Sequence, residues 1–294
     1  MANNVYQMVT DRIIEQLENG VIAWRKPWTG GIESAIGYTS RKPYSLINQF
    51  LLGEPGEYLT FKEVERLGGK VNKGAKARFV VFYKQMTYTE KVVNEEGEEE
   101  TNTKRIPLLR FYNVFHIKDT TIPSKAKEGT SNIVELDGKA DEVIMAYVKR
   151  EGLNFINNKP SSRAFYSPSL DEVVVPMPSQ YSEMAEYYST TFHELTHSTM
   201  LAHRCNRMSE NKIACFGNED YSREELVAEI GSAMICTSLG ISIPESFKNS
   251  VAYIKHWIQA LKNDNKMIVW AASRAEKASD YILYNKKPSK QEEL

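Results

Sequence analysis

The chain has 294 residues, of which 41% are hydrophobic and 26% charged, and its formal net charge is −1 at neutral pH. This composition is that of a globular protein, and it excludes a collagen-like or coiled-coil rod and a chain disordered throughout. The length favours two domains, and the absence of a run of about 18 apolar residues argues against a membrane helix and predicts a cytoplasmic protein.

A helix and an irregular, strongly aromatic segment open the chain. Apolar residues recur at helical spacing until Asn19-Gly20, which predicts a first helix of about four turns. The segment 22–44 is rich in glycine, proline, aromatic and basic residues and is expected to be a loop. Two more helices are expected, one over residues 45–52 and one from the N-cap Thr60 to Gly68-Gly69.

Two strands and an acidic turn are expected next. The runs 78–83 and 108–115 are rich in β-branched and aromatic residues, which predicts the two arms of a hairpin. Residues 95–100 are all glutamate apart from Gly97, so the tip of the hairpin is expected to be solvated.

The segment 118–131 marks the expected domain boundary, because it contains proline, serine and glycine and little apolar side chain. The sequence therefore predicts a first domain over residues 1–120, a linker over 121–131 and a second domain over 132–294. The fold class expected for the whole chain is α+β.

The second half is mainly helical by pattern, with two short strands. Helices are expected over residues 140–151, 222–239, 247–262 and 267–284. The strands 163–167 and 171–176 precede a long helix that Ser182 is expected to cap and that runs to about residue 200. Residues 173–175, all valine, fit a core strand or, alternatively, a strand that pairs with an extended peptide.

Residues 193 to 197, His-Glu-Leu-Thr-His, match the HExxH motif of zinc peptidases. On a helix, His193 and His197 lie on one face, one turn apart, as two ligands of one Zn²⁺ ion require. Glu194 lies beside them, where it can act as general base toward a metal-bound water. A chance match is the alternative, but the surrounding pattern favours a zincin-like metallopeptidase fold with an HExxH helix and a small sheet.

Several residues compete as the third metal ligand. Glu225 on the next helix, with Glu229 one turn later to orient a ligand histidine, matches the arrangement of gluzincins. His203 stands where the pattern HExxHxxGxxH has its last histidine, but Met200 replaces the glycine at which that chain turns back. Glu225 is favoured, and Glu229, Glu224 and His203 stay open as alternatives.

The first half interleaves aromatic and basic side chains. Residues 1–89 contain 12 Lys and Arg against 8 Asp and Glu, and tryptophan and tyrosine alternate with arginine and lysine between residues 24 and 44. Such residues hold single-stranded DNA, because bases stack on aromatic rings while cations contact phosphates. Alternatively, Trp24 and Trp28 are core residues around a proline turn, and the lysines form an ordinary solvated face.

Ordered motifs along nearly the whole chain resemble those of ArdC-type antirestriction proteins, which conjugative plasmids and mobile elements carry. In the first half the motifs are Trp24-x-Lys26-Pro27-Trp28, Arg41-x-Pro43-Tyr44-x-x-Ile47-Asn48, Tyr58 to Lys62, and Gly68-Gly69-x-Val71-x-Lys73-Gly74. In the second half they are Tyr187-Tyr188, His193 to His197, Arg204 to Arg207, Glu224 to Glu229, and Trp257-Ile258-x-x-Leu261.

The resemblance implies an N-terminal domain that binds single-stranded DNA, joined to a C-terminal zincin-like metalloprotease domain, in a protein that shields incoming DNA from host restriction. The expected partners are single-stranded DNA and a protein or peptide substrate, and no membrane. The expected DNA-binding residues are Trp24, Lys26, Trp28, Arg41, Tyr44, Asn48, Lys73 and Lys76. Two alternatives remain: a DNA-binding shield whose zincin domain is structural or catalytically idle, and a peptidase whose first half recognises protein partners.

Overall fold

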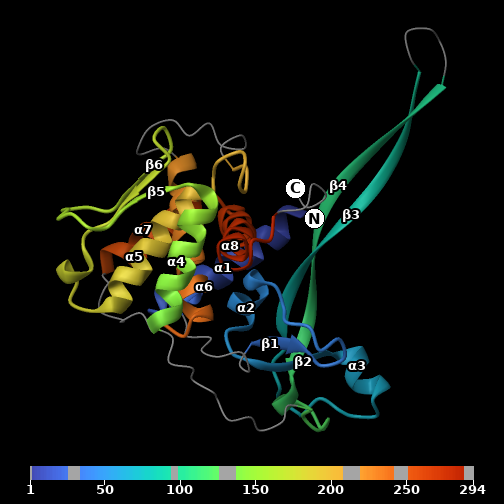
Figure 1. Cartoon of the computed structure of the whole chain (residues 1–294). Helices are drawn as coiled ribbons and strands as arrows, with labels where there is room; N and C mark the ends of the chain where they lie inside the picture. Colours follow the sequence, from blue (N-terminus) through green and yellow to red (C-terminus); the bar gives the residue numbers. More distant parts are fainter. Residues whose placement is uncertain are drawn as a thin grey trace.

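The computed structural model describes residues 2–25, 34–93, 99–125, 137–207, 219–241 and 251–287. Within these residues the chain is an α+β structure, as predicted. The first half forms a four-stranded sheet with three α-helices, and the second half forms five α-helices and a three-stranded sheet (Figure 1). None of the helices described is long and apolar enough to cross a membrane.

The helices predicted for the first half are confirmed. They are α1 (Ala2–Glu18), α2 (Leu46–Leu52) and α3 (Phe61–Arg66). Thr60 caps α3 as expected: its hydroxyl accepts a hydrogen bond from the Glu63 N–H, and its own N–H donates to the Glu63 carboxylate.

The first sheet has the strand order β1-β2-β4-β3. Its strands are β1 (Ala35–Gly37), β2 (Gly56–Thr60), β3 (Arg78–Val93) and β4 (Glu99–His116). β1 is parallel to β2, whereas the other neighbours are antiparallel.

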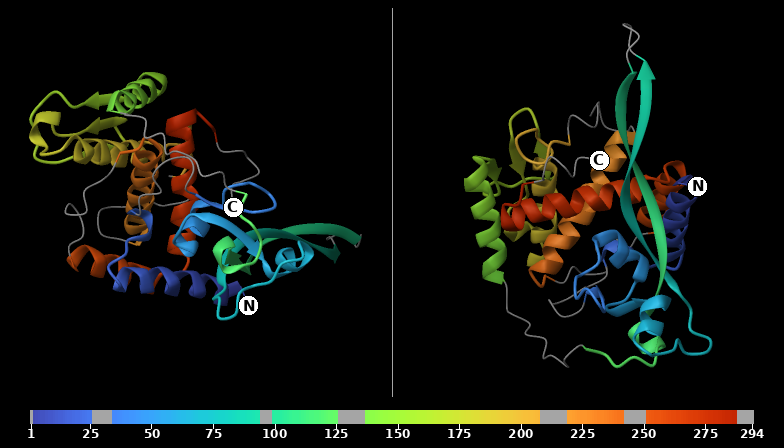
Figure 2. Two further views of the ribbon diagram at one scale, coloured as in Figure 1. Left: turned by 90° about the horizontal axis from the view of Figure 1, so that it is seen from below. Right: turned by 90° about the vertical axis from the view of Figure 1, so that its right-hand side faces the viewer.

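β3 and β4 are far longer than the strands predicted at 78–83 and 108–115. They continue as a twisted two-stranded ribbon that projects away from the helices (Figures 1 and 2). Glu99 and Glu100, expected in the turn, belong to β4 instead, opposite valines of β3. The rest of the expected acidic tip, 95–98, lies outside the described residues.

Two amides of α2 satisfy the backbone at the two edges of this sheet. The Asn48 side chain accepts from the N–H of Val81 on β3 at 2.7 Å and donates to the Val81 carbonyl at 2.8 Å. The Gln49 side chain does the same for Ala35 on β1, at 2.8 and 3.0 Å. One short helix therefore bridges both edge strands and occupies backbone groups that would otherwise pair with another chain.

The second sheet has the order β5-β7-β6. Its strands are β5 (Asn154–Ile156), β6 (Phe165–Ser167) and β7 (Glu172–Val174). β7 pairs on both sides, parallel with β5 and antiparallel with β6, and Val173 is fully buried. The valine strand is therefore a core strand, and its two neighbours, β5 and β6, form the edges of the sheet.

The remaining helices follow the predicted pattern. They are α4 (Asp137–Glu151), α5 (Met184–Ser198), α6 (Glu219–Ser238), α7 (Val251–Asn263) and α8 (Met267–Tyr284). The predicted cap of α5 was wrong. The N-cap residue is Glu183, and the hydroxyl of Ser182 donates to Glu186 at 3.0 Å instead.

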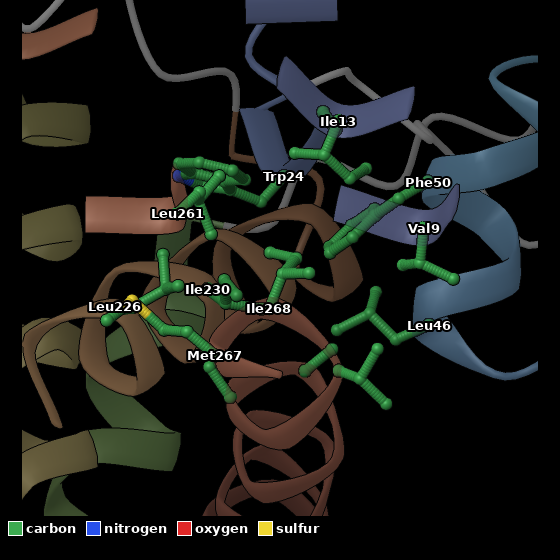
Figure 3. Packing of buried hydrophobic residues seen from close by; sticks show 14 of the residues in the cluster. Val9, Ile13, Trp24, Leu46, Phe50, Leu226, Ile230, Leu261, Met267 and Ile268 are labelled. Atoms are coloured by element: carbon green, nitrogen blue, oxygen red, sulfur yellow. The ribbon is translucent and has the colours of Figure 1, made fainter. Parts of the chain in front are cut away.

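One hydrophobic core joins the two halves of the sequence. Side chains of α1 and α2 pack against side chains of α6, α7 and α8 (Figure 3). The labelled residues are Val9, Ile13, Trp24, Leu46 and Phe50 from the first half and Leu226, Ile230, Leu261, Met267 and Ile268 from the second (Figure 3). The two predicted domains thus share buried apolar surface, which favours a fixed arrangement of one against the other.

The start of the predicted linker belongs to the first half. Ile122 is buried with Tyr38, Leu59 and Val64, and the hydroxyl of Ser124 donates to the Glu57 carboxylate at 2.7 Å. The remainder of the predicted linker, 126–131, lies outside the described residues.

Candidate functional site

Helix α5 carries both motif histidines on one face. The rings of His193 and His197 meet edge to face, with centroids 4.8 Å apart, and their Nε2 atoms lie 3.2 Å from each other. Both rings are shielded, with 13% and 10% of the side chain exposed. The helical spacing therefore produces the convergence that the sequence predicts.

Helix α6 brings Glu225 to the same point. One carboxylate oxygen lies 3.5 Å from Nε2 of His193, and the other lies 3.3 Å from Nε2 of His197. Among the described residues, His193, His197 and Glu225 form the one group of three or more His, Cys, Asp or Glu side chains close enough to hold a metal ion.

The donor set fits a tetrahedral divalent ion. Ligand atoms about 2.0–2.1 Å from such an ion lie about 3.3 Å apart, close to the three observed separations of 3.2 to 3.5 Å. Nε2 of His193, Nε2 of His197 and the Glu225 carboxylate face one another, so one ion placed among them would contact all three. Two neutral imidazoles and a carboxylate are also the ligand types of catalytic zinc sites.

Close contact between α5 and α6 positions these side chains. A Cβ atom on Gly231 would lie 2.7 Å from a Thr196 methyl group, so glycine permits this approach of the helices. The hydroxyl of Ser232 donates to the carbonyl of Ser189 at 2.6 Å and ties the helices together.

A buried ion pair stands behind His197. Oε1 of Glu224 lies 3.4 Å from Nδ1 of His197, and the Glu224 carboxylate accepts hydrogen bonds from Arg207 at 3.0 and 2.7 Å. The Arg207 guanidinium also donates to the Thr199 hydroxyl at 2.7 Å and to the Thr196 carbonyl at 2.9 Å. Since both partners are almost fully buried, the pair holds a defined geometry.

The site favours positive charge. Burial opposes protonation of His197, but the Glu224 and Glu225 carboxylates outweigh it and raise the pKa of His197 to about 10. The pKa of the Glu225 carboxyl is lowered in turn: burial opposes its ionisation, and hydrogen bonds from His193 and His197 overcome that effect. A cation among these groups is thus electrostatically favoured.

None of the three alternative third ligands, Glu224, Glu229 and His203, belongs to this group of side chains. His203 is exposed and lies outside the group of His193, His197 and Glu225. Glu229, expected to orient a ligand histidine, accepts a hydrogen bond from the Tyr253 hydroxyl at 3.1 Å. The carboxylate at the rear nitrogen of His197 belongs to Glu224, one residue before Glu225 instead of one turn after it.

Two of the residues expected to bind DNA are structural. Trp24, only 3% exposed, packs edge to face on Trp257 at 6.2 Å in the shared core, so it is a core residue, as the alternative prediction had it. Asn48, 1% exposed, is the amide that pairs with the β3 backbone. Neither side chain can reach a nucleic acid, because tertiary packing encloses both.

The other expected DNA-binding residues differ in burial and in ion pairing, and two of them are not described by the structure. Arg41 pairs with the buried carboxylate of Glu57. Tyr44 is partly buried, whereas Lys73 and Lys76 are exposed. Lys26 and Trp28 lie outside the described residues.

The sequence alone did not reveal the roles of Arg207 and Glu224. Each of the two residues lies among other polar or charged residues in the sequence, so no local pattern marks them as a buried pair. Only the structure shows that the two residues meet.

The chain is similar to known proteins in both of its halves. Residues 3–115 match the N-terminal domain of anti-restriction factor ArdC, and residues 142–274 match a zincin-like metallopeptidase domain. At 32% identity over 95% of its length, the chain is similar to two proteins of Escherichia coli named DNA primase TraC, of which it spans 20% and 27%. It is also 27% identical to protein y4eC of Sinorhizobium fredii, of which it covers 91%.

Two crystal structures of the antirestriction ArdC protein from plasmid R388 share the fold. The metal-free structure has a TM-score of 0.69 at 33% identity, and the Mn(II)-bound structure has the same score at 31% identity. In both cases the similarity covers 95% of this chain and 97% of that one. The chain therefore belongs to the family of ArdC antirestriction proteins.

Proposed function

We propose that the chain is a divalent-metal-dependent peptidase, with Zn²⁺ as the ion, joined to a domain that binds single-stranded DNA. The observation that carries the proposal is the convergence of Nε2 of His193, Nε2 of His197 and the Glu225 carboxylate at mutual distances of 3.2 to 3.5 Å. Three protein ligands leave a position for water, which distinguishes a catalytic zinc site from a structural one.

A bound ion would supply a water of lowered pKa and polarise a peptide carbonyl. Glu194 follows His193 directly on α5, is only 8% exposed, and lies close enough to His197 to influence its pKa. We assign it the role of general base, which takes a proton from the attacking water and passes it to the leaving amine.

The Glu224–Arg207 pair would fix the orientation of His197. A carboxylate at Nδ1 favours the tautomer with the proton on Nδ1, which leaves the lone pair on Nε2 for the ion. Arg207 holds that carboxylate ionised and in place through its two hydrogen bonds.

The strand β6 offers a place for an extended peptide. It forms one edge of the second sheet and packs against α5, which carries the histidines. In the described residues, no backbone hydrogen bond reaches its outer side. A substrate strand could pair there and pass in front of the metal site.

DNA binding by the first half rests on the family and on surface charge. The first half matches the N-terminal domain of ArdC, and relatives of the chain are named DNA primase TraC. Lys73 and Lys76 are exposed and form no ion pair among the described residues, so they can contact phosphates.

One experiment separates this function from that of a passive DNA shield. Protection of incoming DNA against a restricting host is measured for the wild type, for Glu194→Gln and for Glu183→Gln, an exposed control at the start of the same helix. We expect Glu194→Gln to lose protection with its fold and DNA affinity unchanged, and Glu183→Gln to keep it. Full protection by Glu194→Gln would support the shield and overturn the peptidase.

A further inference from the structure

Three aromatic rings gather on one face of the first sheet, where the β3–β4 ribbon leaves the body of the protein. Phe82 of β3 and Tyr112 of β4 meet edge to face at 5.7 Å, and Tyr44 lies 6.3 Å from Phe82. Phe82 and Tyr112 each expose 46% of their surface, unusually much for large aromatic side chains. We call Tyr44, Phe82 and Tyr112 the aromatic platform.

Strand register places the platform and a cation on the same face. Val80 pairs with Tyr112 and Phe82 with Arg110, so by alternation Phe82, Arg110 and Tyr112 share one side of the sheet. That side also carries Arg78 and Val114, and over residues 78–82 and 110–114 its strand positions contain no Asp or Glu.

The loop before α2 adds Tyr44 and a second cation. Pro43 forms a bridge with Ile36 of the neighbouring strand, so Lys42 and Tyr44, on either side of Pro43, point to the same side by alternation. The ring of Tyr44 also packs on Tyr58 at 6.3 Å, which anchors it to the face that carries Phe82.

The platform is held rigidly. The Asn48 amide pairs with both backbone groups of Val81, next to Phe82, and the Gln49 amide donates to the carbonyl of Tyr44 at 3.0 Å. Rings fixed before binding lose little conformational entropy when a ligand stacks on them.

The cations beside the platform are available to a ligand. Arg110 and Lys42 are exposed, and neither forms an ion pair within the described part of the chain. Arg78, by contrast, is paired with Glu54 at 2.6 Å. An exposed aromatic patch alone would suit a protein partner equally well, but unpaired cations beside it favour a polyanion.

We propose that the aromatic platform is the base-stacking surface for single-stranded DNA, with Arg110 and Lys42 contacting the phosphates beside it. This inference rests on the proposed DNA binding of the first half and names the residues that would carry out that binding. Single strands fit better than a duplex, because only unpaired bases expose their faces to aromatic rings. Since every base has such a face, the surface would bind without strong sequence preference.

The test uses the full chain and a dye-labelled oligothymidylate of about 15 nucleotides, near the upper end of the site size of such surfaces. Affinity is measured by fluorescence anisotropy for Phe82→Ala, Tyr112→Ala and the ring-preserving variants Phe82→Tyr and Tyr112→Phe. The matched control is Phe111→Ala, which removes a 43% exposed ring from the opposite face of the same strand.

We expect each alanine variant of the platform to weaken binding by roughly 5- to 100-fold, because stacking is worth about 1–3 kcal/mol per base. The ring-preserving variants and Phe111→Ala should bind within about twofold of the wild type. Arg110→Ala should also flatten the dependence of log affinity on log salt concentration by about 0.7, the contribution of one phosphate contact on a single strand.

The outcomes separate the inference from the function on which it rests. If the wild type binds the oligonucleotide and Phe82→Ala and Tyr112→Ala bind equally well, the platform is not the DNA surface, while DNA binding stands. If the folded wild type does not bind the oligonucleotide, the proposed DNA binding itself is wrong. If the wild type is a dimer that Phe82→Ala dissociates, the platform is a contact between copies of this chain and the inference is overturned.

Discussion

Arg207 donates two hydrogen bonds to the Glu224 carboxylate, at 3.0 and 2.7 Å, deep between the turn after α5 and the start of α6. The same carboxylate faces the rear of His197 at 3.4 Å. Because both charges are buried, each one is stable there only while the other neutralises it. The orientation of His197, a candidate metal ligand, therefore depends on both residues.

Replacement of Arg207 by methionine should therefore affect folding and metal binding together. An unpaired buried carboxylate would lower the free energy of unfolding by about 3–5 kcal/mol. Without Arg207, the Glu224 carboxylate would no longer hold the His197 ring in position, which should weaken Zn²⁺ binding by about 10- to 100-fold. Urea denaturation and competition with a chelating dye measure the two effects.

The double variant Arg207→Met with Glu224→Gln is the matched control for this prediction. It removes the unpaired charge, so it should recover part of the stability but not the metal affinity. A folded Arg207→Met variant with wild-type Zn²⁺ affinity would contradict the role assigned to the pair.

The assignment of Glu225 as the third metal ligand is tested by replacing two glutamates of α6 in turn. Glu225→Ala removes one of three ligands and should reduce Zn²⁺ affinity by at least about 100-fold, whereas Glu229→Ala removes the partner of Tyr253 and should leave affinity near that of the wild type. Isothermal titration of the metal-free variants measures this. Stronger loss in Glu229→Ala than in Glu225→Ala would reverse the assignment.

Asn48 should matter for stability and not for DNA. Asn48→Ala leaves the N–H and carbonyl of Val81 without their buried partner, which should cost about 1–3 kcal/mol of unfolding free energy. Asn72→Ala, which removes an exposed amide, should change stability by less than about 0.5 kcal/mol. The residual folded Asn48→Ala protein should bind oligothymidylate like the wild type, and a selective loss of DNA affinity at full stability would show that Asn48 contacts DNA.

The Asp171 carboxyl makes the free energy of unfolding depend on pH under acidic conditions. Partial burial opposes its ionisation, but hydrogen bonds from Arg204 and Tyr166 outweigh that and hold the pKa of Asp171 below its ordinary value of 3.8. A lowered carboxyl pKa contributes stability above the unfolded-state value, and this contribution is lost as pH falls through the folded-state value.

Asp171→Asn should accordingly lose less unfolding free energy than the wild type between about pH 5 and pH 2. Asparagine tolerates the left-handed backbone at this position, where φ is 45°, so the comparison isolates the charge. Urea denaturation of metal-free protein across this pH range measures the slopes. Equal slopes would mean that the Arg204 pair does not lower the pKa of Asp171.

The periodic parts of the fold could be predicted from the sequence. The apolar spacing predicted α8 at its observed bounds, and the spacing of His193 and His197 predicted their convergence, because both depend only on helix geometry. The length of the β3–β4 ribbon was missed, since lysine, glutamate, asparagine and proline in its outer part carry little strand signal.

Features that depend on tertiary contacts could not be predicted. Trp24 and Asn48 are residue types that often bind DNA. In the fold, however, α6 and α7 enclose Trp24, and the side chain of Asn48 is hydrogen-bonded to the backbone of β3. Whether Glu224 or Glu229 stands behind His197 depends on how α6 is rotated against α5 and on the position of Arg207.

We propose that His193, His197 and Glu225 form an open metal centre. An anomalous-scattering map from a crystal of the full chain grown with Zn²⁺ would locate the ion. We expect one peak with Nε2 of His193, Nε2 of His197 and a Glu225 oxygen at about 2.0–2.2 Å, and water in the remaining position. A peak completed by His203 or Glu229, or one enclosed by four protein ligands, would contradict it.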